Sequence, residues 1–156
     1  VFTVGYRHGS LITFINKRLL MKKLIALVFG LLMAGAALAQ IKVVYHLSEG
    51  IPQASRAIGN IRNHLAADPT ARIVVVTHGA GIDFLLDGAV NTQKQPFAGS
   101  ISDLANKGVE FRVCNNTLVS RNISPDKVAM EAKIVPSGVA EVARLQAKEG
   151  FVYLHP

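Results

Sequence analysis

The chain has 156 residues, of which 50% are hydrophobic, with one cysteine and a formal net charge of +7. Five of the seventeen Lys and Arg residues, but none of the ten Asp and Glu residues, precede residue 40. Residues 40–156 therefore carry twelve basic and ten acidic side chains, a net charge of +2. This balance and the low aromatic content remove the main support for nucleic-acid binding. The single cysteine excludes an intrachain disulfide.

The segment before residue 40 predicts export. Residues 21–23 (Met-Lys-Lys) give a positive start, residues 24–39 are apolar, and Ala-Leu-Ala at 37–39 matches a small-x-small cleavage site. We therefore expect a signal peptide over residues 21–39 and a periplasmic protein. An apolar stretch this short falls below the roughly 20 residues that span a bilayer, so a retained membrane anchor is the less favoured alternative. We interpret residues 1–20 as an upstream extension.

From residue 41 onward, apolar runs alternate between the periodicities of strands and helices. The sequence predicts strands over 41–45, 72–77, 109–113, 133–135 and 151–154, and helices over 52–66, 98–107, 125–131 and 139–148, with an apolar turn over 82–86. This alternation predicts one α/β domain, residues 40–156, a three-layer α/β/α Rossmann-like domain with a mainly parallel five-stranded sheet. Residues 89–97 are the most loop-like internal stretch and a candidate flap.

Each predicted strand ends at a polar or reactive residue: His46, His78, Cys114, Ser137 and His155. The carboxyl ends of parallel strands lie at one edge of the sheet, about 4.8 Å apart, and ligands bind there. We therefore expect these residues to share one cleft. Cys114 is the candidate nucleophile, and His46 and His78 are the candidate bases that would activate its thiol.

The residues next to these strand ends are candidates for holding an anionic ligand. Backbone N–H groups at the start of a helix suit an anion, and the predicted ligand-binding residues are Asn115, Asn116, Gly79, Gly81, Ser137 and Gly138. The pair Gly79-x-Gly81 is not a dinucleotide loop, because Phe84 stands where the third glycine belongs. The histidines have no i, i+4 or Cys-x-x-Cys companion. We therefore predict no metal site and no cofactor.

These residues also have structural interpretations. A lone cysteine at a strand end often packs as a small apolar residue, and Ser137 can serve only as a helix cap. Asn115 and Asn116 can be turn residues, since asparagine tolerates left-handed backbone. His46 can simply hydrogen-bond a loop carbonyl, and His155 lies next to the end of the sequence.

Several separated motifs then follow in a fixed order. They are Val-Cys-Asn-Asn-Thr-Leu at 113–118, Ser-Pro-Asp at 124–126, Val-Pro-Ser-Gly-Val-Ala-Glu at 135–141 and Gln-Ala-Lys-Glu-Gly-Phe-Val-Tyr-Leu-His-Pro at 146–156. With His-Gly-x-Gly-Ile at 78–82, they make residues 41–156 resemble the DsrE/DsrF-like family, in particular its small stand-alone branch. The resemblance implies a compact Rossmann-like domain that assembles into homotrimers or hexamers. In the sulfur-oxidation and tRNA-thiolation branches, a cysteine at the position of Cys114 carries persulfide sulfur between proteins.

Our leading hypothesis is a periplasmic sulfur carrier or sulfurtransferase-like protein. Cys114 would accept persulfide sulfur from a donor and pass it to a partner thiol, with His46 or His78 lowering its pKa and the helix amides after Cys114 and Ser137 stabilising the anion. The alternative is a non-catalytic, oligomeric module that binds a small anion or metabolite, with Cys114 as a packing residue. A Cys-His hydrolase is the third and weakest option.

Overall fold

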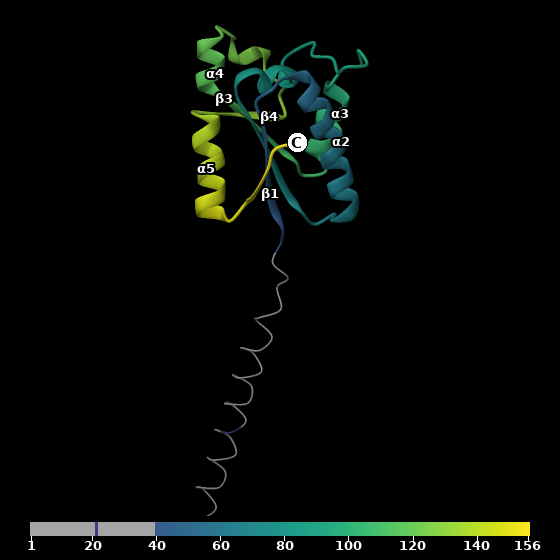
Figure 1. The fold of residues 1–156 in the computed structure, drawn as a ribbon, viewed down its shortest axis with the longest axis vertical. Coiled ribbons are helices and arrows are strands. Elements are labelled where there is room, and N and C mark those ends of the chain that lie inside the picture. The colour runs from purple at the N-terminus through teal and green to yellow at the C-terminus, as the bar shows by residue number, and fades with distance from the viewer. Residues whose placement is uncertain (1–20, 22–39) are drawn as a thin grey trace, which may run out of the picture. The chain divides into compact units, whose positions relative to one another are not determined.

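The computed structural model describes residue 21 and residues 40–156 of the protein. The predicted upstream extension and, apart from Met21, the predicted signal peptide lie outside the described residues. Residues 40–156 form one compact unit (Figure 1). Among the described residues, no helix combines the length and apolar character needed to cross a membrane.

The described residues form a single sheet of five parallel strands. In chain order these are β1 (Lys42–Leu47), β2 (Arg72–Thr77), β3 (Glu110–Cys114), β4 (Ala132–Val135) and β5 (Val152–Leu154). They lie side by side in the order β4-β3-β2-β1-β5, and every pairing is parallel. The predicted α/β fold with a parallel five-stranded sheet is confirmed.

The helices cover both faces of the sheet. They are α2 (Ile51–Ala67), α3 (Ala98–Asn106), α4 (Asn115–Ser120) and α5 (Gly138–Glu149), with 3₁₀ helices η1 (Gly79–Leu85) and η2 (Pro125–Lys127). In Figure 1, α2 and α3 lie on one side of the sheet, and α4 and α5 lie on the other. After β4 the chain reverses direction to reach β5 beside β1, and the right-handed crossover rule therefore places α5 opposite α2.

Side chains that alternate along each strand build two separate cores. On the α2 side, Val43, Tyr45 and Leu47 of β1 belong to the larger core. On the α5 side, the core consists of only six buried residues, namely Val44, Val74, Val76, Val142, Leu145 and Phe151. His46 follows Val44 by two positions and therefore faces the α5 side. The smaller core leaves room on that side for polar residues at the carboxyl ends of the strands.

Two local predictions are corrected. The helix predicted over 125–131 is wrong, because only Pro125–Lys127 are helical. The chain then turns extended: Val128 forms an antiparallel bridge with Leu86, and the Ala129 N–H donates to the Leu85 carbonyl over 2.8 Å. Conversely, helix α4 directly follows Cys114, where the sequence indicated a helix start but gave no bounds for a helix.

Candidate functional site

Cys114 is the last residue of β3 and immediately precedes α4. Its thiol is free, and the residue is buried, with 5% of its surface exposed. The predicted position at a strand end is therefore confirmed, at the edge of the sheet where parallel α/β proteins bind ligands.

Gly138 brings the predicted site residues together. It is the first residue of α5, and a β-carbon added there would lie 3.2 Å from the β-carbon of Cys114 and 3.2 Å from that of His78. The same atom would lie 3.0 Å from the carbonyl oxygen of Thr77. The start of α5 therefore reaches the ends of β2 and β3 only because residue 138 has no side chain.

The surroundings of Cys114 favour its thiolate form. Burial alone would raise the pKa of the thiol. Hydrogen bonds from the Gly138 N–H and from the hydroxyl and N–H of Thr117 outweigh burial and bring this pKa below its ordinary value. The Asn116 N–H, which also donates to the Pro136 carbonyl over 3.3 Å, makes the smallest contribution. The groups that lower the pKa are amides and a hydroxyl. This supports the expected contribution of the helix amides, whereas the same contribution from His46 or His78 finds no support.

Thr117 is a site residue that sequence reasoning missed. Its hydroxyl oxygen accepts the Gly79 N–H over 3.0 Å, and the hydroxyl hydrogen is then free to be donated to the sulfur of Cys114. Arg121, just after α4, donates to the Gly79 carbonyl oxygen over 3.1 Å and to the Asp83 carboxylate over 2.6 Å. These contacts fix the glycine loop after β2 to the helix after β3. Threonine at the third position after a cysteine gives no distinctive sequence signal.

His46 and His78 form an imidazole pair beside this site. Their ring centroids are 4.7 Å apart, with an angle of 33° between the ring planes. His46 Nδ1 shares a hydrogen bond of 2.8 Å with the hydroxyl of Tyr153, which the sequence analysis also missed. The Nε2 atoms of both histidines are buried without a hydrogen-bond partner in the described part of the chain.

The charge state of His46 follows from its packing. Burial, His78 and His155 together lower the pKa of His46, with burial the largest cause. His46 is therefore a neutral imidazole at neutral pH, able to accept or donate a proton but contributing no positive charge. A neutral His46 ring can lie beside the tilted His78 ring without charge repulsion.

Residues from the end of the sequence complete the rim of this site. The ring of His155 stacks on Tyr153, with centroids 6.5 Å apart and 13° between the planes. Gln53, fully buried, donates to His155 Nε2 over 3.1 Å and accepts the N–H groups of Ser48 and Glu49 over 2.8 and 2.9 Å. Gln53 thus joins the loop after β1 to the segment after β5. Gln53 is recognised as a site residue only by its burial, which the sequence does not reveal.

The remaining predicted ligand-binding residues have clear structural functions. The Ser137 hydroxyl accepts the Ala140 N–H over 3.4 Å and caps α5. A β-carbon on Gly81 would overlap the backbone of Leu47, so this glycine allows η1 to pack on the end of β1. Gly79 has φ of +55°, and Asn115 is the first residue of α4. Their predicted contact with a ligand stays a prediction.

Residue 21 and residues 40–156 contain no group of three or more His, Cys, Asp or Glu side chains arranged to hold a metal ion. Cys114, His46 and His78 therefore do not converge as ligands of a metal, although they lie in one region.

Together, the fold and the site define a small Rossmann-like α/β/α domain with one amide-stabilised thiol at the carboxyl edge of its sheet. The model of the DsrE/DsrF-like family matches residues 25–156. The chain therefore belongs to the DsrE/DsrF-like family, as the sequence motifs indicated.

Two solved structures are similar to this chain. One is MTH1491, a protein of unknown function from Methanobacterium thermoautotrophicum, at 30% identity and a TM-score of 0.65, covering 75% of this chain and 100% of that one. The other is the ychN protein from E. coli, at 13% identity and a TM-score of 0.60, covering 75% of this chain and 98% of that one; it supports the fold alone. No curated protein matches the chain.

Proposed function

We propose that this protein is a sulfur carrier, or sulfurtransferase-like protein, in which Cys114 holds persulfide sulfur. The observation that carries the proposal is the set of N–H groups and the hydroxyl around the sulfur, which lower the pKa of the thiol. A thiolate is the form of cysteine that attacks sulfur. Membership of the DsrE/DsrF-like family supports a function of the sulfur-relay kind.

In the loading step, the Cys114 thiolate attacks the outer sulfur of a donor persulfide, R–S–S–H. A new S–S bond forms at Cys114, the S–S bond of the donor breaks, and R–S⁻ leaves. The product is Cys114–S–S–H, so atoms and charge balance without an oxidant. When the thiol starts protonated, the imidazole of His78, whose β-carbon flanks the same glycine, is the nearby base that takes the proton.

In the unloading step, an acceptor thiolate attacks the outer sulfur of the Cys114 persulfide. The acceptor becomes R′–S–S–H, and Cys114 leaves as a thiolate. Thiols of low pKa leave faster in such exchanges, so the same amides that prepare the nucleophile also favour release. The site therefore suits a carrier that loads and unloads rather than one that retains its sulfur.

Mass spectrometry of the intact protein tests this proposal. Incubation with thiosulfate or polysulfide should add about 32 Da, the mass of one sulfur, and dithiothreitol should remove it. Cys114→Ser should take up nothing. The matched variant Thr117→Val should load more slowly at neutral pH, because its thiol has lost a hydrogen-bond donor. No adduct on the wild-type protein, or an adduct that persists in Cys114→Ser, would end the proposal.

A second candidate function follows from the burial of Cys114. A residue with 5% exposure can be a packing residue, in which case the domain is a non-catalytic module that binds a small anion or metabolite. Native-state alkylation with iodoacetamide separates the two functions. A carrier cysteine reacts far faster than the protein unfolds, whereas a packing cysteine reacts only at the rate of unfolding.

The predicted assembly and location belong to the same proposal. We infer a homo-oligomer, trimer or hexamer, that exchanges sulfur with a donor or acceptor protein in the periplasm. Light scattering of the purified protein gives the oligomeric state, and fractionation of cells that express the full chain gives its location. A monomer, or a protein confined to the cytoplasm, would contradict these two inferences without affecting the chemistry at Cys114.

A further inference from the structure

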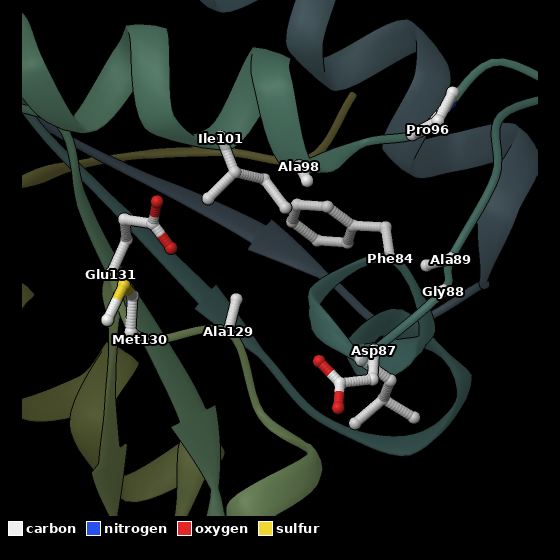
Figure 2. Close-up of a pocket in the computed structure, with 11 residues that line it drawn as sticks. Phe84, Asp87, Gly88, Ala89, Pro96, Ala98, Ile101, Ala129, Met130 and Glu131 are labelled. Carbon is white, nitrogen blue, oxygen red and sulfur yellow. The ribbon is translucent and has the colours of Figure 1, made fainter.

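A separate pocket lies away from Cys114, between the segment after η1, the start of α3 and the segment before β4 (Figure 2). Its volume is about 290 Å³. Its floor includes Phe84, which is 2% exposed and packs edge-to-face against Phe97 and Phe111 with centroids 5.5 and 6.2 Å away. Phe84 therefore forms a rigid wall, because its ring is held by two others.

The lining of this pocket combines apolar surface with negative charge. Phe84, Ala98 and Ile101 supply apolar contacts, whereas the exposed Asp87 and the half-buried Glu131 come from separate segments and lie well apart (Figure 2). Neither carboxylate forms an ion pair with any described residue. The pocket lining, as described, contains no Lys or Arg. A cation with an apolar body complements such a surface, and an anion is repelled by it.

An exposed side chain and the ends of a surface loop border the rim of this pocket. Met130 lines the pocket with 93% of its surface exposed, and its unbranched side chain can fold over a ligand. Ala89 and Pro96, near the two ends of the predicted flap over 89–97, also line the pocket. The flap closes on itself through an antiparallel bridge between Val90 and Pro96, so its base borders the cavity.

We propose that this pocket binds a small organic cation, an alkylammonium or arylalkylammonium compound. The apolar body lies against Phe84 and Ile101, and the carboxylates of Asp87 and Glu131, at separate points of the lining, attract the ammonium group. The site is independent of sulfur transfer, since it shares no residue with the Cys114 site, and Cys114→Ser leaves it intact.

Nuclear magnetic resonance of the full ¹⁵N-labelled chain tests the proposal with three probes of one shape: 2-phenylethylammonium, neutral 2-phenylethanol and anionic 3-phenylpropionate. We expect backbone amide shifts at Gly88, Ala89 and Ala129, with the ammonium compound binding most tightly and the carboxylate most weakly. In the double variant Asp87→Asn, Glu131→Gln, the ammonium compound should bind roughly tenfold more weakly, and its preference over the alcohol should disappear.

A second double variant controls for net charge. Asp103→Asn with Asp126→Asn removes two carboxylates outside the pocket and should leave ammonium binding unchanged, because those side chains face solvent at other sites. Equal binding of all three probes, shifts confined to other residues, or an ammonium preference that survives in the first double variant would overturn the proposal.

Discussion

Replacing Gly138 with alanine tests whether one residue fixes both the fold and the thiol chemistry. The new methyl group would sit 3.0 Å from the Thr77 carbonyl oxygen and 3.2 Å from the β-carbons of Cys114 and His78. These separations are a few tenths of an ångström tighter than ordinary contacts. All three neighbours are backbone or β-carbon atoms, so none can swing aside by changing rotamer. The first turn of α5 must therefore move away from the sheet.

The size of the effect follows from this displacement. Overpacking of a well-packed site costs about 1–3 kcal/mol, and the backbone contact with a buried strand makes relaxation difficult. As the helix start moves, the Gly138 N–H leaves the sulfur of Cys114. The thiol pKa should then rise toward its ordinary value, because burial opposes ionisation and one of the groups that counters it is lost. Loss of stability and loss of thiolate should therefore appear together.

Two assays measure these effects. Urea denaturation gives the free energy of unfolding, and the pH dependence of iodoacetamide alkylation gives the thiol pKa. Gly59→Ala is the matched control, since a β-carbon at Gly59 in the middle of α2 meets nothing within 4 Å. That variant should gain about 0.5–1 kcal/mol with an unchanged thiol pKa. A Gly138→Ala protein as stable as the wild type, with the same alkylation profile, would refute the reasoning.

Three further predictions concern single contacts. Gly81→Ala should cost more than about 3 kcal/mol, measured by urea denaturation, because its β-carbon overlaps the Leu47 backbone; soluble protein of wild-type stability would contradict this. Thr117→Val should raise the pH midpoint of Cys114 alkylation, whereas Thr117→Ser should keep it. The pKa of Glu141 is lowered in the folded protein, first through its hydrogen bond with Arg144. Its contribution to the free energy of unfolding is therefore full above the ordinary pKa of about 4.3 and is lost as pH falls through the folded-state pKa. Glu141→Gln should therefore lower the free energy of unfolding by about 1–3 kcal/mol at pH 7 and reduce the loss of stability on acidification. Asp103→Asn, in an exposed pair, should cost less than about 0.5 kcal/mol.

The sequence predicted the three central strands well because burial on both faces leaves near-continuous apolar runs. Residues 72–77 show this directly, and the predicted bounds match β2. The convergence of His78 and Cys114 followed from the same reasoning, since parallel strands bring their carboxyl ends to one edge. The pairing of distant strands is thus the part of this fold that the apolar pattern of the sequence predicts.

The sequence indicated a helix start after Cys114, but the extent of helix α4 and the residues that depend on it could not be predicted in this way. Asparagine and threonine are weak helix formers, so residues 115–117 resemble a turn. The helix forms because tertiary contacts hold it: the Asn116 N–H donates to the Pro136 carbonyl, and Arg121 donates to the Gly79 carbonyl. Such contacts join segments distant in sequence and have no periodic signature. Thr117 was missed for the same reason.

The error at residues 125–131 has the opposite origin. Ser124 and Pro125 are a correct helix-start signal, and η2 begins where they predict. The chain nevertheless becomes extended at Val128, because Val128 pairs with Leu86 shortly before β4 begins at Ala132. A local signal specifies where a helix begins, but the pairing partner decides how far it continues.

The lowered pKa of Cys114 also bears on both steps of the proposed sulfur transfer. A thiol of lower pKa is a weaker nucleophile once ionised, but it is the better leaving group. Loading of Cys114 is therefore favoured by the larger fraction of thiolate, and unloading is favoured because Cys114 is a better leaving group. Both effects come from the amides of Gly138, Asn116 and Thr117. A positively charged histidine would have a similar effect on the pKa but would lose it as pH rises. Because His46 is neutral, amides provide a stabilisation that does not titrate, and the fraction of thiolate should depend on pH through Cys114 itself.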